Sequence, residues 1–211
     1  MTIKERAVQV PLLLEQEYPD ATCALHYQTD YELLFATRLS AQCTDARVNQ
    51  VTPALFARFP RLEDYAAADV SEIESLIQSC GLFHTKARDI KAAAQMLLEE
   101  YHGQMPDTME QLLRLPGVGR KTANLILGDL FHQPAIVADT HCIRLSNRLG
   151  FVKNTKDPLK VEQALKKLIA PDKQSDFCHR LVHHGRVVCT ARKPLCAQCC
   201  LSAVCPSFGK A

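Results

Sequence analysis

The stretch Leu115-Pro-Gly-Val-Gly-Arg-Lys-Thr-Ala123 joins two amphipathic helical patterns through a short turn that contains two glycines. Before it, the apolar residues that follow Thr108 share one face of a helix. Thr108 and Gln111 have the spacing of a capping box. After it, apolar residues recur at the spacing of a buried helical stripe, at Ala123, Ile126, Leu127 and Leu130. The sequence therefore predicts two helices joined by a tight hairpin, over about residues 107–130.

The turn of this hairpin is a candidate anion site. Pro116 has no N–H and ends the first helix, while Gly117 and Gly119 can adopt positive φ and carry no Cβ. The N–H groups of Gly117, Val118 and Gly119, with those that begin the second helix, would converge on an anion such as phosphate. From the glycines alone, an ordinary tight corner between two helices is the alternative.

Lys121 stands in the first turn of the second predicted helix, where the positive end of the helix dipole disfavours an ammonium group. A lysine gains little structural stabilisation at such a position. Its amine, beside a phosphate site, could serve as a nucleophile toward a sugar or carbonyl carbon. A simple contact between Lys121 and a phosphate is the alternative interpretation.

Composition narrows the class of protein. The chain has 211 residues, enough for a buried core in one or two domains, and 47% of them are apolar. No apolar run is long enough to span a bilayer, and the N-terminal segment, interrupted by Pro11, does not read as a signal peptide. We expect a cytoplasmic protein without membrane contact, whose ten cysteines do not form a disulfide framework.

Charge is distributed unevenly along the chain, although the formal net charge is only +2. No carboxylate side chain follows Asp176, whereas five cationic residues do: Arg180, Arg186, Arg192, Lys193 and Lys210. Such a tail is often just a solvated surface. Together with a phosphate-binding hairpin, it suggests contact with a DNA backbone.

Apolar residues recur mostly with a period of 3.6, so we predict an all-α fold. The pattern predicts a first helix from Thr2 to Tyr18, bent or restarted at Pro11, and another from Asp30 as N-cap. Ser71 with Glu74 has the spacing of a capping box, and Gly81 is an expected C-cap. The remaining predicted helices cover about residues 85–101, 140–149, 158–169 and 175–187.

The most specific pattern in the chain is Cys189-x6-Cys196-x2-Cys199-x5-Cys205. Four thiolates so close together, in a reducing compartment, are typical of a metal centre. Tetrahedral sulfur ligation suits zinc and an iron-sulfur cluster alike. Cys200 adjoins Cys199 and could compete with it as a ligand. The five other cysteines have apolar neighbours, and we expect them to be small buried side chains: Cys23, Cys43, Cys80, Cys142 and Cys178.

The hairpin resembles the helix-hairpin-helix of base-excision DNA glycosylases, and LPGVGRKTA is similar to the endonuclease III branch of that family. The cysteine spacing also resembles the 4Fe-4S loop of that branch. The resemblance implies a six-helix barrel-like domain at 22–134 that contains the hairpin. It implies a second, four-helix domain of residues 1–21 and 135–211, with a 4Fe-4S cluster on loop 189–205, held by Cys189, Cys196, Cys199 and Cys205.

The segment Val137-Ala-Asp-Thr-His-Cys-Ile-Arg144 follows the hairpin. By spacing alone, Asp139 is best interpreted as a helix N-cap. The resemblance implies that Asp139 is the essential aspartate of the family and Lys121 its nucleophile. Both roles are compatible, because capping would fix the carboxylate where it can stabilise positive charge on a sugar.

The resemblance also implies which residues enter the duplex when a nucleotide is extruded. Gln42 matches the glutamine that fills the vacated space, and Leu82 matches the second intruding residue, a wedge. From the residues alone, a polar helix end and an ordinary core leucine are the alternatives. Arg192 and Lys193 lie inside the cysteine loop, so a cluster would position them against phosphates.

These features together predict a monomeric, bifunctional DNA glycosylase and AP lyase. It would remove oxidised pyrimidines from duplex DNA and cleave 3′ to the abasic site. Its partner would be double-stranded DNA with damaged bases or abasic sites, encountered in a bacterial nucleoid. The alternatives are a monofunctional mismatch or adenine glycosylase, a non-catalytic helix-hairpin-helix DNA-binding protein, and a zinc-dependent regulator.

Overall fold

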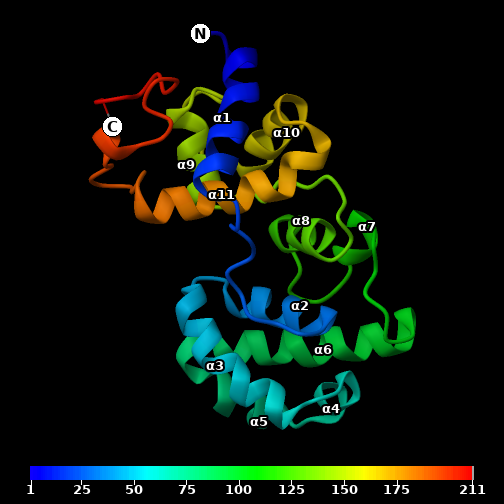
Figure 1. The fold of residues 1–211 in the computed structure, drawn as a ribbon. Coiled ribbons are helices and arrows are strands. Elements are labelled where there is room, and N and C mark those ends of the chain that lie inside the picture. The colour runs from blue at the N-terminus through cyan, green and yellow to red at the C-terminus, as the bar shows by residue number, and fades with distance from the viewer. Residues whose placement is uncertain (211) are drawn as a thin grey trace. The chain divides into compact units, whose positions relative to one another are not determined.

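The computed structural model describes residues 1–210, which fold into helices and turns with no strand (Figure 1). The predicted all-α class is confirmed. The helices form two compact units, one of residues Ala24–Leu130 and one of Met1–Cys23 with the chain from Phe131 onward. Within residues 1–210, no helix combines the length and the apolar composition needed to cross a membrane.

The unit of residues 24–130 is arranged around its longest helix, α6 (Phe83–Tyr101). Helix α6 packs against α4 (Leu62–Ala67), α5 (Val70–Ile77) and α2 (Asp30–Leu39), and α2 also contacts α8 (Arg120–Asp129) (Figure 1). The remaining elements are α3 (Asp45–Arg58), the short 3-10 helix η1 (Gln78–Cys80) and α7 (Met109–Leu112).

An aromatic cluster fixes the core of this unit. The ring of Tyr65 lies 4.7 Å from that of Phe35 and 5.1 Å from that of Phe59, centroid to centroid. All three side chains are almost completely buried. Burial of each contributes roughly 1.5–3 kcal/mol. The cluster therefore holds α4 against α2 and the end of α3.

The other unit joins the N-terminal helix α1 (Ile3–Glu17) to α9 (Thr140–Arg148), α10 (Pro158–Leu168) and α11 (Gln174–Val187), followed by η3 (Cys196–Gln198) (Figure 1). A 3-10 turn, η2 (Pro171–Lys173), precedes α11. Helix α11 packs against both α1 and α9. A Cβ on Gly185 would lie 2.7 Å from Nδ1 of His141, so this glycine lets α9 and α11 approach closely.

The first residues of the helices can be compared with the predicted N-caps. Thr108 is the N-cap of α7 and accepts the Gln111 N–H, as predicted, but the Gln111 side chain accepts from the Thr108 hydroxyl, so the predicted capping box is only half formed. Asp30 was the wrong choice, because the preceding Thr29 caps α2 through a capping box with Glu32. A capping box at Ser71 is also wrong. Asp69 is the N-cap there, and its carboxylate accepts from the Ser71 N–H.

Two helices escaped prediction, α3 and α4. Helix α3 contains Pro53 in its interior, and α1 likewise continues without interruption through the buried Pro11. An interior proline costs about 3 kcal/mol. Tertiary burial of side chains on both sides of it offsets that cost, in α3 by Val51 and Leu55.

Within residues 1–210, none of the ten cysteines forms a disulfide. Cys80, Cys142 and Cys178 are buried, as expected for small apolar side chains. The same expectation is wrong for Cys23 and Cys43, which are only half-buried because they lie outside the helices, in the loops before and after α2.

Candidate functional site

The hairpin between α7 and α8 contains a tight turn of defined geometry. The N–H of Val118 donates to the carbonyl of Leu115 at 3.1 Å, and Gly117 has φ 75°. With Pro116 at the second position, this matches a type II turn, which requires positive φ at its third residue. Gly119 then serves as the N-cap of α8 with an extended backbone, φ −106°.

The surroundings require a glycine at only one of the two hairpin positions, Gly117. A Cβ on Gly117 would lie 2.6 Å from Nε of Arg38 and 2.8 Å from Oδ2 of Asp89. These two side chains form an ion pair, with Arg38 Nη2 2.6 Å from Asp89 Oδ2. Gly117 therefore lets the hairpin rest on this ion pair. A Cβ on Gly119 would have nothing within 4 Å, so that side of the turn is open.

Lys121 lies in the first turn of α8 and is exposed. The opposite face of α8 is buried through Ala123 and Ile126. The helix thus presents Lys121 outward beside the open face of Gly119. The hairpin offers an amine and a helix N-terminus on one surface, a combination that suits an anionic, electrophilic substrate.

Asp139 is the N-cap of α9, which confirms the capping role expected from its spacing. Its Oδ1 accepts the Cys142 N–H at 2.7 Å, and the residue is half-buried. The apolar stretch 135–138 before it is buried. The carboxylate is therefore fixed from both sides, by its hydrogen bond and by the anchored chain in front of it.

Gln42 and Leu82 share an unusual backbone conformation. Gln42 has φ 55° and Leu82 has φ 48°, both left-handed values that non-glycine residues rarely adopt. Gln42 is exposed, and Leu82 is 56% exposed, which excludes its interpretation as a core leucine. Both side chains therefore project from short strained loops of the same unit.

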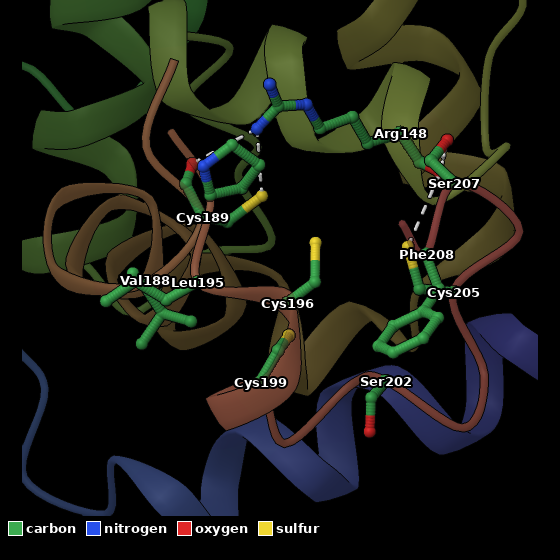
Figure 2. A pocket seen from close by; sticks show the side chains of 11 residues that line it. Arg148, Val188, Cys189, Leu195, Cys196, Cys199, Ser202, Cys205, Ser207 and Phe208 are labelled. Carbon is green, nitrogen blue, oxygen red and sulfur yellow. Dashed lines mark hydrogen bonds between the residues drawn. The ribbon is translucent and has the colours of Figure 1, made fainter. Parts of the chain in front are cut away.

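The four cysteines of the 6-2-5 motif line one pocket that is partly open to solvent (Figure 2). Cys200 does not line it. Among residues 1–210, no three His, Cys, Asp or Glu side chains are grouped closely enough to hold a single metal ion. The four cysteines instead line one common pocket.

Two arginines of α9 bind the chain around the first cysteine, as Figure 2 shows for Arg148. Arg148 Nη1 lies 3.2 Å from Sγ of Cys189 and 2.7 Å from the carbonyl of Thr190. Arg144 Nη2 donates to the carbonyls of Gly185 and Cys189, both at 2.9 Å. Sequence reasoning gave Arg148 no role, because its partners lie far along the chain.

A histidine supports another cysteine. His184 Nε2 lies 3.3 Å from Sγ of Cys199, and its Nδ1 lies 2.9 Å from the hydroxyl of Tyr18. Burial, with His183 nearby, lowers the pKa of His184 to about 4, so the ring is neutral at pH 7. Sequence reasoning missed this residue too, and the only local signal was its place among the histidines of the tail.

The cationic tail is not uniform. Arg180 is 5% exposed and donates to the carbonyl of Tyr18, so it is a structural residue and not a DNA contact. Arg192 and Lys193 are exposed on the cysteine loop. The predicted site residues thus divide between the units: Gln42, Leu82, the hairpin and Lys121 in one, Asp139 and the cysteine loop in the other.

Comparison with known proteins gives consistent matches. A family model described as HhH-GPD superfamily base excision DNA repair protein matches residues 35–171. The chain is 51% identical over 205 residues to endonuclease III of Synechocystis sp., covering 97% of this chain and 93% of that protein. It is 43% identical over 188 residues to endonuclease III of Bacillus subtilis, with coverages of 89% and 86%.

Solved structures agree with these relatives. The structure of a trapped covalent intermediate between an endonuclease III and DNA matches with a TM-score of 0.93 and 41% identity, covering 99% of this chain and 98% of that one. A thermostable thymine-DNA glycosylase, at 22% identity and a TM-score of 0.88, shares the fold.

The hairpin geometry predicts unequal effects of two alanine substitutions. Gly117→Ala should lower the free energy of unfolding by about 1–3 kcal/mol, because the new Cβ meets Arg38 at positive φ. Gly119→Ala, the matched control, should cost less than about 1 kcal/mol. Urea denaturation of both variants measures this difference, and equal losses would contradict the packing role of Gly117.

Proposed function

This chain belongs to the endonuclease III family of base excision repair DNA glycosylase/AP lyases, and we propose that Lys121 and Asp139 carry its chemistry on oxidised pyrimidines. The observation that carries the proposal is an exposed lysine beside an open helix N-terminus, in a hairpin shaped to accept phosphate. Similarity to a protein trapped covalently on DNA supports a nucleophilic amine.

In the proposed reaction, the lone pair of Lys121 Nζ forms a bond to C1′ as the glycosidic bond breaks. The departing base takes the bonding electrons and a proton. The C1′–O4′ bond then breaks, O4′ takes up a proton, and the nitrogen lone pair gives a protonated Schiff base between the lysine and C1′. Loss of a proton from C2′ then expels the 3′ phosphate, which cleaves the strand by β-elimination.

We assign Asp139 the role of stabilising positive charge on the sugar and assisting proton transfer at the amine. Its hydrogen bond to the Cys142 N–H uses only Oδ1. The cap fixes the carboxylate without neutralising it, so the group can serve both the helix and the reaction.

DNA would be held by the hairpin at Gly117, Val118 and Gly119. Because the Val118 N–H already donates to Leu115, the stronger phosphate donors are the N–H of Gly119 and those of the first turn of α8. Gln42 and Leu82 would fill the space left by the extruded nucleotide. Their strained, exposed backbones support this, since such strain clusters at functional positions.

We further propose that Cys189, Cys196, Cys199 and Cys205 hold a 4Fe-4S cluster. The four thiols around one pocket, with Arg148 and His184 in contact with two of them, fit thiolate ligands that need compensating donors. Such a cluster stabilises the loop in its folded shape. The loop in turn presents the exposed Arg192 and Lys193 to phosphates.

The remaining parts of the proposal concern organisation. Residues 22–134 would carry the hairpin with Lys121 and both intruding loops, and residues 1–21 with 135–211 would form the cluster domain and supply Asp139. A monomer would act on duplex DNA in the bacterial cytoplasm. A monofunctional glycosylase or a non-catalytic binding protein would leave the exposed Lys121 without a chemical role.

Borohydride trapping tests the nucleophile. Native protein incubated with a duplex that contains thymine glycol or an abasic site should yield a covalent adduct, and Lys121→Ala should yield none. Lys160→Ala, which removes an exposed lysine of α10, should trap like native protein. An adduct that survives in Lys121→Ala would assign the nucleophile elsewhere.

Asp139 substitutions should separate capping from catalysis. Asp139→Asn keeps an N-cap acceptor, so it should stay close to native stability while excision slows by about 100-fold or more. Asp139→Ala should show the same slow excision and also lose about 1 kcal/mol of stability. Single-turnover excision and urea denaturation, run on both variants, measure the two effects. An excision rate in Asp139→Asn equal to that of the native protein would contradict the catalytic role of Asp139.

Alanine substitution of the neighbouring residues Cys199 and Cys200 should change the iron content of the protein differently. Native protein should be yellow-brown with about four irons per chain, and Cys199→Ala should lose most of that iron together with about tenfold DNA affinity. Cys200 does not line the pocket, so Cys200→Ala should retain the iron and the DNA affinity of the native protein. Iron and sulfide analysis with fluorescence anisotropy checks this. A colourless native protein that contains zinc would refute the cluster.

A further inference from the structure

Lys86 is a charged residue with no exposed surface. It lies in the first turns of α6 and is 0% exposed. Burying an ammonium group is costly unless it is hydrogen-bonded, and burial lowers the pKa of Lys86. The proposed chemistry does not use this side chain. Its burial therefore calls for a structural or positioning role that offsets the cost.

The partners of Lys86 are two main-chain carbonyls from different loops. Nζ donates to the carbonyl of Leu39 and to that of Cys80, each at 2.8 Å. Leu39 ends α2 and leads directly into the turn that carries Gln42. Cys80 ends η1 and leads through Gly81 into Leu82. One ammonium group thus joins the bases of both loops that are proposed to enter the duplex.

The wedge is tied to Lys86 a second time through the main chain. The Lys86 N–H donates to the carbonyl of Leu82 at 3.1 Å. Left-handed backbone at Gln42 and Leu82 costs roughly 1–2 kcal/mol per residue, so the surroundings must hold both tips in place. The Lys86 side chain contacts the base of each loop, and a hydrogen bond between the Cys43 and Cys80 thiols joins the same two loops as well.

We propose that Lys86 is a positioning residue that couples Gln42, the plug that fills the vacated space, to Leu82, the wedge, so that both enter DNA as one rigid unit. This inference rests on the proposed roles of those two residues. A shift of either loop would stretch a hydrogen bond to the ammonium group and thereby weaken the placement of the other. Substitutions at the two tips should then be interdependent, because residues joined through one network have non-additive effects.

A double-mutant cycle measures this coupling. The affinity for a duplex that contains a tetrahydrofuran abasic analogue is measured by anisotropy for native protein, Gln42→Ala, Leu82→Ala and the double variant. This readout needs neither cleavage nor a particular damaged base. Each single substitution should weaken binding by about tenfold. If the two residues were independent, the double variant would bind weaker by the product of the two losses. We expect its loss to be at least about fivefold smaller than that product, which is on the order of the coupling measured between residues in contact.

The same cycle is repeated in a Lys86→Met background. There the loss of affinity in the double variant should equal the product of the two single losses to within about twofold. Lys91→Met is the matched control. It removes another lysine of α6 that binds one carbonyl, that of Ala68 at the end of α4, away from both loops. Coupling should persist there. If Lys86→Met does not fold, Lys86→Gln replaces it, because its shorter amide cannot span both carbonyls.

Three results overturn the coupling: independent losses already in the native background, coupling that persists without Lys86, or coupling lost equally in Lys91→Met. The native cycle decides the first without any change at Lys86. If neither tip substitution weakens binding, the assignment of plug and wedge fails with the inference. Borohydride trapping at Lys121 is unaffected by that outcome, so failure of the proposed chemistry is read separately.

Discussion

Cationic side chains bound to main-chain carbonyls at helix ends are the interaction on which both units depend. The last carbonyls of a helix have no partner within it, and lysine or arginine can satisfy them. Four residues do so, at α2 with η1, at α4, at α1 and in the last turn of α11: Lys86, Lys91, Arg180 and Arg144. Arg148 binds carbonyls just beyond the end of α11, at Cys189 and Thr190.

This device has a functional consequence because the carbonyls lie where loops begin. A loop held at its first residue loses little further freedom when it binds a ligand, so less of the binding free energy is spent on ordering. In one unit the loops held this way carry Gln42 and Leu82. In the other, Arg148 holds the chain at Cys189, where the cysteine loop begins. The proposed DNA contacts and cluster ligands thus share one mode of support.

Local patterns could be predicted from the sequence, and long-range partners could not. The type of fold, the hairpin, the cysteine motif and the Asp139 cap depend on residues within a few positions of each other. The ion pair of Arg38 with Asp89 under Gly117, and the contact of His184 with Cys199, depend on tertiary structure. Asp30 failed as a cap because Thr29, also a good cap, stands beside it, and spacing alone does not choose between neighbours.

Asp139 shows why a structural interpretation of a residue does not exclude a chemical one. An N-cap needs one acceptor oxygen, and a carboxylate has two. The cap bond at Oδ1 fixes the side chain at the start of α9, where a free aspartate would sample several rotamers. A fixed carboxylate can stabilise charge without reorganising during the reaction. The local structure that makes Asp139 look ordinary in the sequence is therefore what would prepare it for the catalytic role that we propose.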